Sequence, residues 1–356
     1  MKKTALISAT LLSGVCSLAQ AADLQVGLKA ADALASSGAS PTELTISFTN
    51  TGKKDVKILR WFTAEDGALA DNLFTVTRDG KAVEYIGRHY KRPAPTAKDY
   101  VTIKAGQSLS QQLDLSAFYD MSQAGTYAVS YEVEQAGADT PSLKQTLLAR
   151  PEVLRSASIS FWVDGVEDKG IAIKQPMVAD IGISSIGYQG SCTNSEKSSI
   201  NNAVSAAQSI SNAALAYLQG NSNPSGSTRY KTWFGTYSSS RYSTVTSHFS
   251  AIANAASTKP LVFNCACNDS AYAYVYPSQP YTIYLCNAFW SAPTNGTDSK
   301  AGTIVHELSH FNVVAGTDDI VYGQSGAKSL ALSSPSQAIQ NADSHEYFAE
   351  NTPSLP

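Results

Sequence analysis

The stretch His306-Glu307-Leu308-Ser309-His310 decides how the second half of this 356-residue chain is organised. Side chains four residues apart lie on one face of a helix. Both imidazoles can therefore bind one zinc ion while Glu307 points towards the open position of the metal. The preceding residues favour a helix, because Asp298 or Ser299 can cap it and apolar residues follow at helical spacing. The pattern predicts a helix that carries two metal ligands and a catalytic base.

A catalytic zinc site needs a third protein ligand, with the fourth position left for water. A third His six residues after the second is excluded, because position 316 is a glycine. A Glu from a later helix could serve, and Glu346 and Glu350 are available. The other candidate is Asp319, in a turn between Gly316 and Gly323 that can fold back under the helix. We prefer Asp319 and keep Glu346, a gluzincin arrangement, as the alternative.

The motif and the residues after it resemble the aspzincin metallopeptidases, or deuterolysin family, whose pattern is HExxH followed by GTxDxxYG. Residues 306–323 read HELSHFNVVAGTDDIVYG. The likeness is greatest to the peptidyl-Lys metalloendopeptidase branch and extends over about residues 187–356. It includes TWFGTYSSSR (232–241) and NADSHEYFAEN (341–351).

This resemblance implies a zinc-dependent endopeptidase with one catalytic Zn²⁺ ion and protein or peptide substrates. It also implies a mainly helical α+β fold of the zincin type, with a small β-sheet, for residues 187–356. The implied ligands are His306, His310 and Asp319, with Asp319 rather than Asp318 in the third place. Glu307 is then expected to act as the general base, and Tyr322 to stabilise the transition state.

Two acidic residues near the C-terminus match those that, in the peptidyl-Lys branch, receive the side chain of a substrate lysine. They are Asp343 and Glu346. Three residues apart on a helix, their carboxylates share a face and can flank one ammonium group. We therefore expect cleavage on the amino side of lysine. A solvated acidic helix end is the alternative interpretation.

Residues 1–21 are typical of a secretory signal. Lys2 and Lys3 precede an apolar stretch that is too short to span a membrane, and Ala19-Gln20-Ala21 provides a cleavage site of small residues. We expect a secreted protein that is not held in a membrane. The formal net charge of −3 and the lack of a basic run argue against a nucleic-acid partner. We also expect a monomer.

Residues 22–163 are predicted to form an immunoglobulin-like β-sandwich that serves as a prodomain. Short alternating stretches are separated by turn residues, with an Asp79-Gly80 hairpin turn among them. The predicted strands are 44–48, 56–61, 74–77, 100–103, 109–115 and 126–133. His89 is interpreted as a surface loop residue, and no chemistry is expected in this region. We expect the prodomain to cover the zinc cleft as an intramolecular inhibitor of a zymogen.

A linker at residues 164–186 is predicted to contain the processing site. It is rich in Gly and also contains a Pro. Lys169 and Lys174 lie in this stretch and are conceivable positions of self-processing. Of the helices predicted beyond it, one runs from about residue 194 to Gly220 and another from about 240 to 256. His345 is interpreted as structural, and His248 as a packed or surface residue, with a distal metal ligand as its alternative.

Four cysteines remain after the signal segment, which is consistent with two disulfides in an oxidising compartment. A bridge between Cys265 and Cys267 is disfavoured on an extended strand. The family resemblance implies the pairs Cys192–Cys265 and Cys267–Cys286. Residues 272–276 and 281–285 are predicted to form a hairpin, whose edge could bind a substrate backbone by strand addition.

A function from another class is the alternative interpretation of the whole chain. A secreted adhesion or binding protein with a structural metal would use the β-sandwich as its working part. Such a protein would have no need of Glu307 within the motif.

Overall fold

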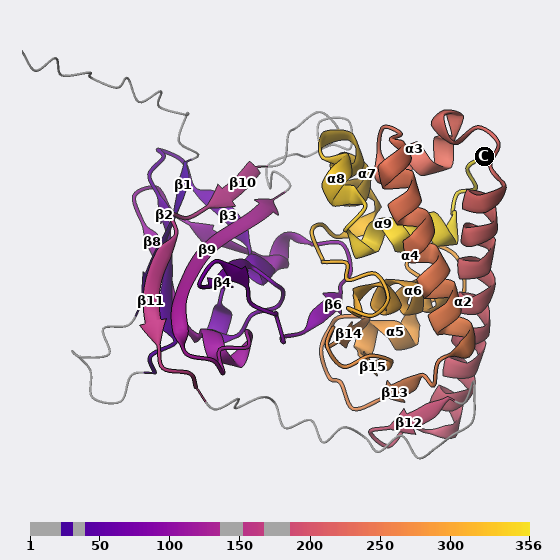
Figure 1. Cartoon of the computed structure of the whole chain (residues 1–356), viewed down its shortest axis with the longest axis horizontal. Coiled ribbons are helices and arrows are strands. Elements are labelled where there is room, and N and C mark those ends of the chain that lie inside the picture. The colour runs from indigo at the N-terminus through magenta and orange to yellow at the C-terminus, as the bar shows by residue number, and fades with distance from the viewer. Residues whose placement is uncertain (1–22, 31–39, 136–151, 167–185) are drawn as a thin grey trace, which may run out of the picture.

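The computed structural model describes residues 23–30, 40–135, 152–166 and 186–356. Within these ranges the chain forms an all-β half followed by a mainly helical half, and strand β6 reaches from the first to the second (Figure 1). Each half has its own large apolar core. No helix among the described residues is both long enough and apolar enough to cross a membrane.

The all-β half packs several antiparallel sheets around one core. One sheet has the strand order β1-β2-β8, a second β10-β9-β4-β5 with β11 also paired to β9, and β3 pairs with β7. The strands are β1 (Leu24–Ala30), β2 (Glu43–Asn50), β3 (Val56–Leu59), β4 (Phe74–Arg78), β5 (Lys81–Ala82), β7 (Tyr100–Ile103), β8 (Ser108–Asp114), β9 (Gly125–Gln135), β10 (Glu152–Arg155) and β11 (Ile159–Val163).

Alternation of apolar and polar residues explains these strands. In β2, the side chains of Leu44, Ile46 and Phe48 are buried, and the residues between them face outwards. The turn predicted at Asp79-Gly80 is present, with positive φ at both residues, as a type I′ hairpin turn requires. The six predicted strands are confirmed, although the one expected at 56–61 ends at Leu59. The immunoglobulin-like connectivity and the prodomain boundaries stay predictions.

The second half combines helices with a small sheet of strand order β12-β13-β15-β14-β6. Strands β12, β13 and β15 are parallel, and β14 is antiparallel to β15. Its own strands are β12 (Gly187–Gln189), β13 (Val262–Asn264), β14 (Ala273–Val275) and β15 (Thr282–Leu285). Its helices are α2 (Asn194–Gly220), α3 (Thr228–Phe234), α4 (Ser239–Thr258), α5 (Asn287–Ser291), α6 (Lys300–His310), α7 (Gly323–Ser333), α8 (Pro335–Ala338) and α9 (Ala342–Glu350).

Helix α6 lies at the centre of this half. Every residue of α6 is buried, as expected for a helix that is covered on all sides. It packs against α2, α4 and α9, and the side chain of Ser299 caps its N-terminus by accepting a hydrogen bond from the amide of Gly302. Helix α2 begins with the predicted capping box of Thr193 and Glu196. The motif helix is therefore held rigidly in the core.

Strand β6 (His89–Lys91) comes from the all-β half but pairs with the sheet of the helical half. It runs antiparallel to β14, with Tyr90 opposite Tyr274 (Figure 1). The interpretation of His89 as a surface loop residue is wrong, because its side chain is buried at this junction. A three-residue strand has too short a pattern to be recognised alone, and here pairing with β14 stabilises it.

Both disulfides join the cysteines that the family resemblance implied. Cys192 is bonded to Cys265, and Cys267 to Cys286. The first ties the start of α2 to the end of β13, and the second ties the loop before β14 to the end of β15. The linker candidates Lys169 and Lys174 lie outside the described residues.

The two disulfides should stabilise the protein unequally. Loss of the bridge that closes 73 residues should cost about 4 kcal/mol, and loss of the bridge that closes 19 residues about 3 kcal/mol, on the chain-entropy model. Denaturant unfolding of the two Cys→Ser double variants of the full chain measures both losses. A larger loss for the shorter loop would contradict this explanation.

Candidate active site

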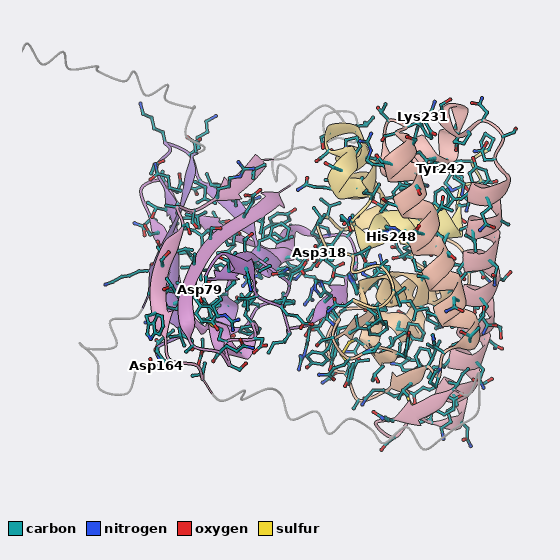
Figure 2. The ribbon with its side chains drawn as sticks, viewed as in Figure 1. Asp79, Asp164, Lys231, Tyr242, His248 and Asp318 are labelled. Atoms are coloured by element: carbon teal, nitrogen blue, oxygen red, sulfur yellow. A yellow bond between two sulfur atoms is a disulfide. The ribbon has the colours of Figure 1, made fainter. Side chains whose placement is uncertain are left out.

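Asp319 lies between the two histidines of α6. The Nε2 atom of His306 is 3.0 Å from Asp319 Oδ1, and the Nε2 atom of His310 is 3.5 Å from Asp319 Oδ2. The Gly316–Gly323 turn folds back under the helix, as the sequence predicted, and Asp319 is buried there. Two imidazole nitrogens and a carboxylate therefore converge on one point. The neighbouring Asp318 is half exposed and lies where the two halves of the protein face each other (Figure 2).

Further contacts orient both imidazole rings. Nδ1 of His310 donates a hydrogen bond of 2.7 Å to the carbonyl of Thr317, which leaves the lone pair of Nε2 facing Asp319. Nδ1 of His306 lies 3.0 Å from Asp343 Oδ1, and its Nε2 likewise faces Asp319. Such carboxylate and carbonyl partners are typical of metal-binding histidines.

The nitrogen and oxygen atoms that could bind a metal at this point lack ordinary hydrogen-bond partners. Nε2 of both histidines, Oδ1 of Asp319 and Oε2 of Glu307 are buried without one. Buried polar atoms normally form hydrogen bonds. Several such atoms that face one another without hydrogen bonds therefore indicate a bound partner of another kind. A divalent metal with nitrogen and oxygen ligands fits this donor set, and zinc prefers it. The residues present therefore fit the metal that the motif implies.

Two other groups of side chains bring three donors close together. One consists of His306, Asp343 and Glu346, but these carboxylates already surround the ammonium group of Lys91 at 3.1 and 3.0 Å. The other consists of His89, His310 and Asp319, in which His89 comes from the all-β half and stacks on His310. The His306, His310 and Asp319 set lies within the helical half, as the first group does, but among the described residues no lysine forms a salt bridge with it.

Opposing charges shift the protonation of the ligand side chains. Burial disfavours the charged form of Asp319, but His310 and His306 outweigh it and lower the pKa of Asp319. Burial likewise opposes a charged His306, yet Asp319, Asp343 and Glu346 raise the pKa of its ring well above its usual value. Burial outweighs its neighbours at His310 and lowers the pKa of that ring, which favours the neutral form that binds metals.

Glu307 is fully buried beside the ligands. Burial raises its pKa to about 8, with Asp319 adding to the shift. A carboxyl group whose pKa lies near neutrality can both take up and release a proton. Its Oε1 accepts a hydrogen bond of 3.1 Å from the backbone amide of Lys91. Glu307 therefore touches the backbone of the strand that lies along β14.

A cluster of carboxylates beside the metal site holds a lysine. The Nζ atom of Lys91 lies 3.1 Å from Asp343, 3.0 Å from Glu346 and 3.2 Å from Asp298, and its side chain is fully buried. Burial opposes the charge on Lys91, but these carboxylates raise its pKa well above its usual value. Asp343 and Glu346 are thus brought together as the sequence predicted. The structure adds Asp298, for which the sequence predicts only a helix-capping role, and the hydroxyl of Tyr347 at 3.4 Å.

Tyr322 lies at the boundary between the two halves. Its hydroxyl is 3.5 Å from Asp71 Oδ2, and its ring packs edge-on against Trp61. The other oxygen of Asp71 lies 3.1 Å from Nδ1 of His89. Burial raises the pKa of Asp71 to about 6. Burial alone would lower the pKa of His89, but the hydrogen bond and the charge of Asp71 outweigh it and raise that pKa to about 9. The all-β half thus contacts Tyr322 twice, through the Asp71 carboxylate at its hydroxyl and through Trp61 at its ring.

Sequence reasoning missed the residues that the all-β half contributes to the site. Asp71, His89 and Lys91 lie far from the motif in sequence, and no local pattern distinguishes them. The structural interpretation of the other two histidines agrees with their contacts. His248 on α4 (Figure 2) and His345 on α9 contact each other at 3.0 Å, and His345 also packs against Phe234.

Comparison with known proteins identifies the relatives of this chain. The family model described as lysine-specific metallo-endopeptidase, of the aspzincin type, matches residues 219–350. An extracellular protease of Aeromonas hydrophila is 44% identical over 97% of both chains. A peptidyl-Lys metalloendopeptidase of Grifola frondosa is 37% identical over 94% of this chain and 95% of its own.

Two further matches cover a smaller share of this chain. A peptidyl-Lys metalloendopeptidase of Pleurotus ostreatus is 54% identical over 46% of this chain and 96% of its own. The solved structure of a zinc peptidase from Grifola frondosa is 49% identical, covers 46% of this chain and all of its own, and has a TM-score of 0.45. The helices and small sheet around α6 agree with the fold that the resemblance implied, and no adhesion function is needed to explain them. On the sequence identity along nearly its whole length, the chain belongs to the aspzincin family and is a metalloendopeptidase.

Proposed function

We propose that this protein is a secreted, zinc-dependent endopeptidase that is made as a zymogen and cleaves peptide bonds on the amino side of lysine. The observation that carries the proposal is the position of Lys91. Its ammonium group is buried among three carboxylates while its backbone amide contacts Glu307. A lysine in this place puts its own amide nitrogen beside the proposed catalytic base.

In this proposal His306, His310 and Asp319 hold one zinc ion. The bound metal supplies Lewis-acid chemistry, which activates water and polarises the carbonyl of the substrate. Glu346 is disfavoured as a ligand because its Oε2 lies 3.3 Å from Nδ1 of His306, on the side of the ring away from Asp319. Its role is instead assigned to the lysine pocket.

Glu307 acts as the proton carrier. As the base it accepts a proton from the attacking water, and as the acid it passes that proton to the amine that leaves. The burial of Glu307 beside the proposed ligands and its contact with an amide nitrogen in the cleft support this role. Tyr322 is proposed to donate its hydroxyl to the carbonyl oxygen as negative charge develops there. That donation requires release of the hydroxyl from Asp71.

The lysine pocket is formed by Asp298, Asp343 and Glu346. Charge-assisted contacts from several carboxylates suit a compact ammonium group. The ring of Tyr347 also lies 5.1 Å from Nζ of Lys91, in the range of a cation–π contact. Strand β14 offers its edge to the backbone, so a substrate is expected to bind as an added antiparallel strand.

The all-β half is proposed to be the inhibitory prodomain. Its strand β6 occupies the edge of β14 and covers Glu307 and the lysine pocket. The Pleurotus relative supports a separable half, since 96% of its length aligns with only 46% of this chain. Secretion is supported by two disulfides and by the name of the Aeromonas relative.

The choice of third ligand can be tested by metal content. Asp319→Ala should lose stoichiometric zinc, because it removes the carboxylate between the two imidazoles. Asp318→Ala is the matched control and should keep the metal, since its side chain is half exposed. Elemental analysis of the folded full-length variants gives the answer. Loss of zinc in Glu346→Gln, with retention in Asp319→Ala, would favour the gluzincin alternative.

The role of Glu307 can be separated from metal binding. Glu307→Gln keeps the shape of the side chain but cannot carry the proton, so kcat should fall by roughly 10²-fold to 10⁴-fold. Zinc content and thermal stability should stay close to those of the unchanged protein. Peptide hydrolysis and elemental analysis of the same preparation test this. Near-normal turnover would exclude Glu307 as the proton carrier.

Substrate preference should depend on the pocket carboxylates. Removal of one partner of a buried charge pair costs about 2–5 kcal/mol, so Glu346→Gln should lower kcat/KM for an Xaa-Lys peptide by roughly 30-fold or more. The matched Xaa-Ala peptide should be affected much less. Kinetics of both peptides with both enzymes measure the ratio. An equal loss for the two peptides would mean that Glu346 does not recognise lysine.

A further inference from the structure

The segment 88–92 of the all-β half fills the cleft in the manner of a bound substrate. Its strand lies antiparallel along the edge of β14, with Lys91 opposite Ala273 and His89 opposite Val275. The amide of Tyr272 donates a hydrogen bond of 2.8 Å to the carbonyl of Lys91. The backbone is thus extended and held in register past the metal site.

The peptide bond between Tyr90 and Lys91 lies beside the catalytic groups. The amide of Tyr90 donates a 2.9 Å hydrogen bond to Asp319 Oδ2, and the amide of Lys91 donates a 3.1 Å hydrogen bond to Glu307 Oε1. These two nitrogens lie on either side of the Tyr90 carbonyl carbon along the chain. That carbon is therefore held between a proposed metal ligand and the proposed proton carrier, with the nitrogen of Lys91 already at Glu307.

Side chains on both sides hold this register. On one side, Nε of Arg88 donates a 2.7 Å hydrogen bond to the hydroxyl of Tyr276. On the other, the Arg92 guanidinium lies 3.4 Å from Asp269 and 4.2 Å from the centre of the Tyr90 ring. The Lys91 side chain between them fills the carboxylate pocket. A shift by one residue would break all of these contacts, because it would turn each side chain to the opposite face.

We propose that the Tyr90–Lys91 bond is a self-cleavage site, cut within the same molecule when the zymogen first binds its metal. This inference rests on the proposed cleavage before lysine. Water adds across the bond, so that its oxygen joins the Tyr90 carbonyl carbon as the C–N bond breaks. Glu307 carries the proton from the water to the Lys91 nitrogen. The products are a Tyr90 carboxylate and a Lys91 amine, and no other reactant is needed.

A cavity borders His310, one of the proposed metal ligands. Its volume is about 220 Å³, and His89 and Asp318 line it as well. Cleavage in another molecule is disfavoured, because Lys91 is buried in the cleft of its own chain. The cut should therefore follow first-order kinetics, at a rate that does not change with protein concentration.

The experiment begins with metal-free full-length protein, to which zinc is returned. Samples are quenched with chelator and denaturant, and mass spectrometry identifies the new termini. The expected result is a fragment that begins at Lys91, formed at the same rate after dilution and absent from Glu307→Gln. The same zinc-loaded sample is assayed on a peptide that contains a single lysine.

These two readouts separate the inference from the proposed function. Cleavage of the peptide before its lysine, without a terminus at Lys91, would overturn the inference and leave the function standing. Failure to cut both the peptide and the Tyr90–Lys91 bond would reject the proposed function, and the inference with it. A Lys91 terminus that forms faster at higher protein concentration would overturn cleavage within one molecule.

Two variants test whether Lys91 selects the bond that is cut. Lys91→Ala should slow the cut at this position by roughly a hundredfold, whereas Lys98→Ala, at an exposed lysine of the same half, should leave it unchanged. A control that does not depend on turnover uses intact Glu307→Gln protein. There an amine-modifying reagent should label Lys98 and leave Lys91 unmodified. Equal labelling of the two lysines would show that Lys91 does not occupy the pocket, even if Lys91→Ala failed to fold.

Discussion

The burial of carboxyl groups is the constraint on which this structure depends. Glu307, Asp319, Asp343 and Glu346 are all removed from water around the contact of α6 with α9 and the turn that follows α6. Buried carboxylates are costly unless cations or hydrogen bonds compensate them. The site therefore calls for positive charge at two neighbouring places. The imidazole pair, with the metal proposed to bind there, would meet the first need, and the ammonium group of Lys91 meets the second.

This constraint links catalysis, specificity and inhibition. The carboxylate of Asp343 touches both Nδ1 of His306 and Nζ of Lys91, so the group that orients a proposed metal ligand also receives the lysine. Strand β14 adds the backbone edge on which an extended chain can pair. In this structure, strand β6 and Lys91 of the same chain meet both requirements. The inhibition and the substrate binding that we propose therefore use the same contacts.

Local patterns were sufficient for much of the fold. Alternating residues predicted the strands of the all-β half, and the apolar stripe with its capping box predicted α2, because side-chain period and backbone geometry are directly linked. The same reasoning failed at β6. Three residues carry no periodic signal, and His89 is buried only because the strand pairs with β14 across the two halves. The arrangement of the halves depends on contacts between residues that are distant in sequence.

The sequence by itself determined the motif helix, the turn with Asp319 and the family resemblance with its disulfide pairs. These depend on spacing within one segment or on a long stretch of similar residues. Only the tertiary structure decided that Asp298 joins the lysine pocket, that Asp71 holds Tyr322, and that Lys91 fills the cleft. A buried charge can be paired by any residue that folding brings within about 4 Å, so its partner cannot be read from sequence distance.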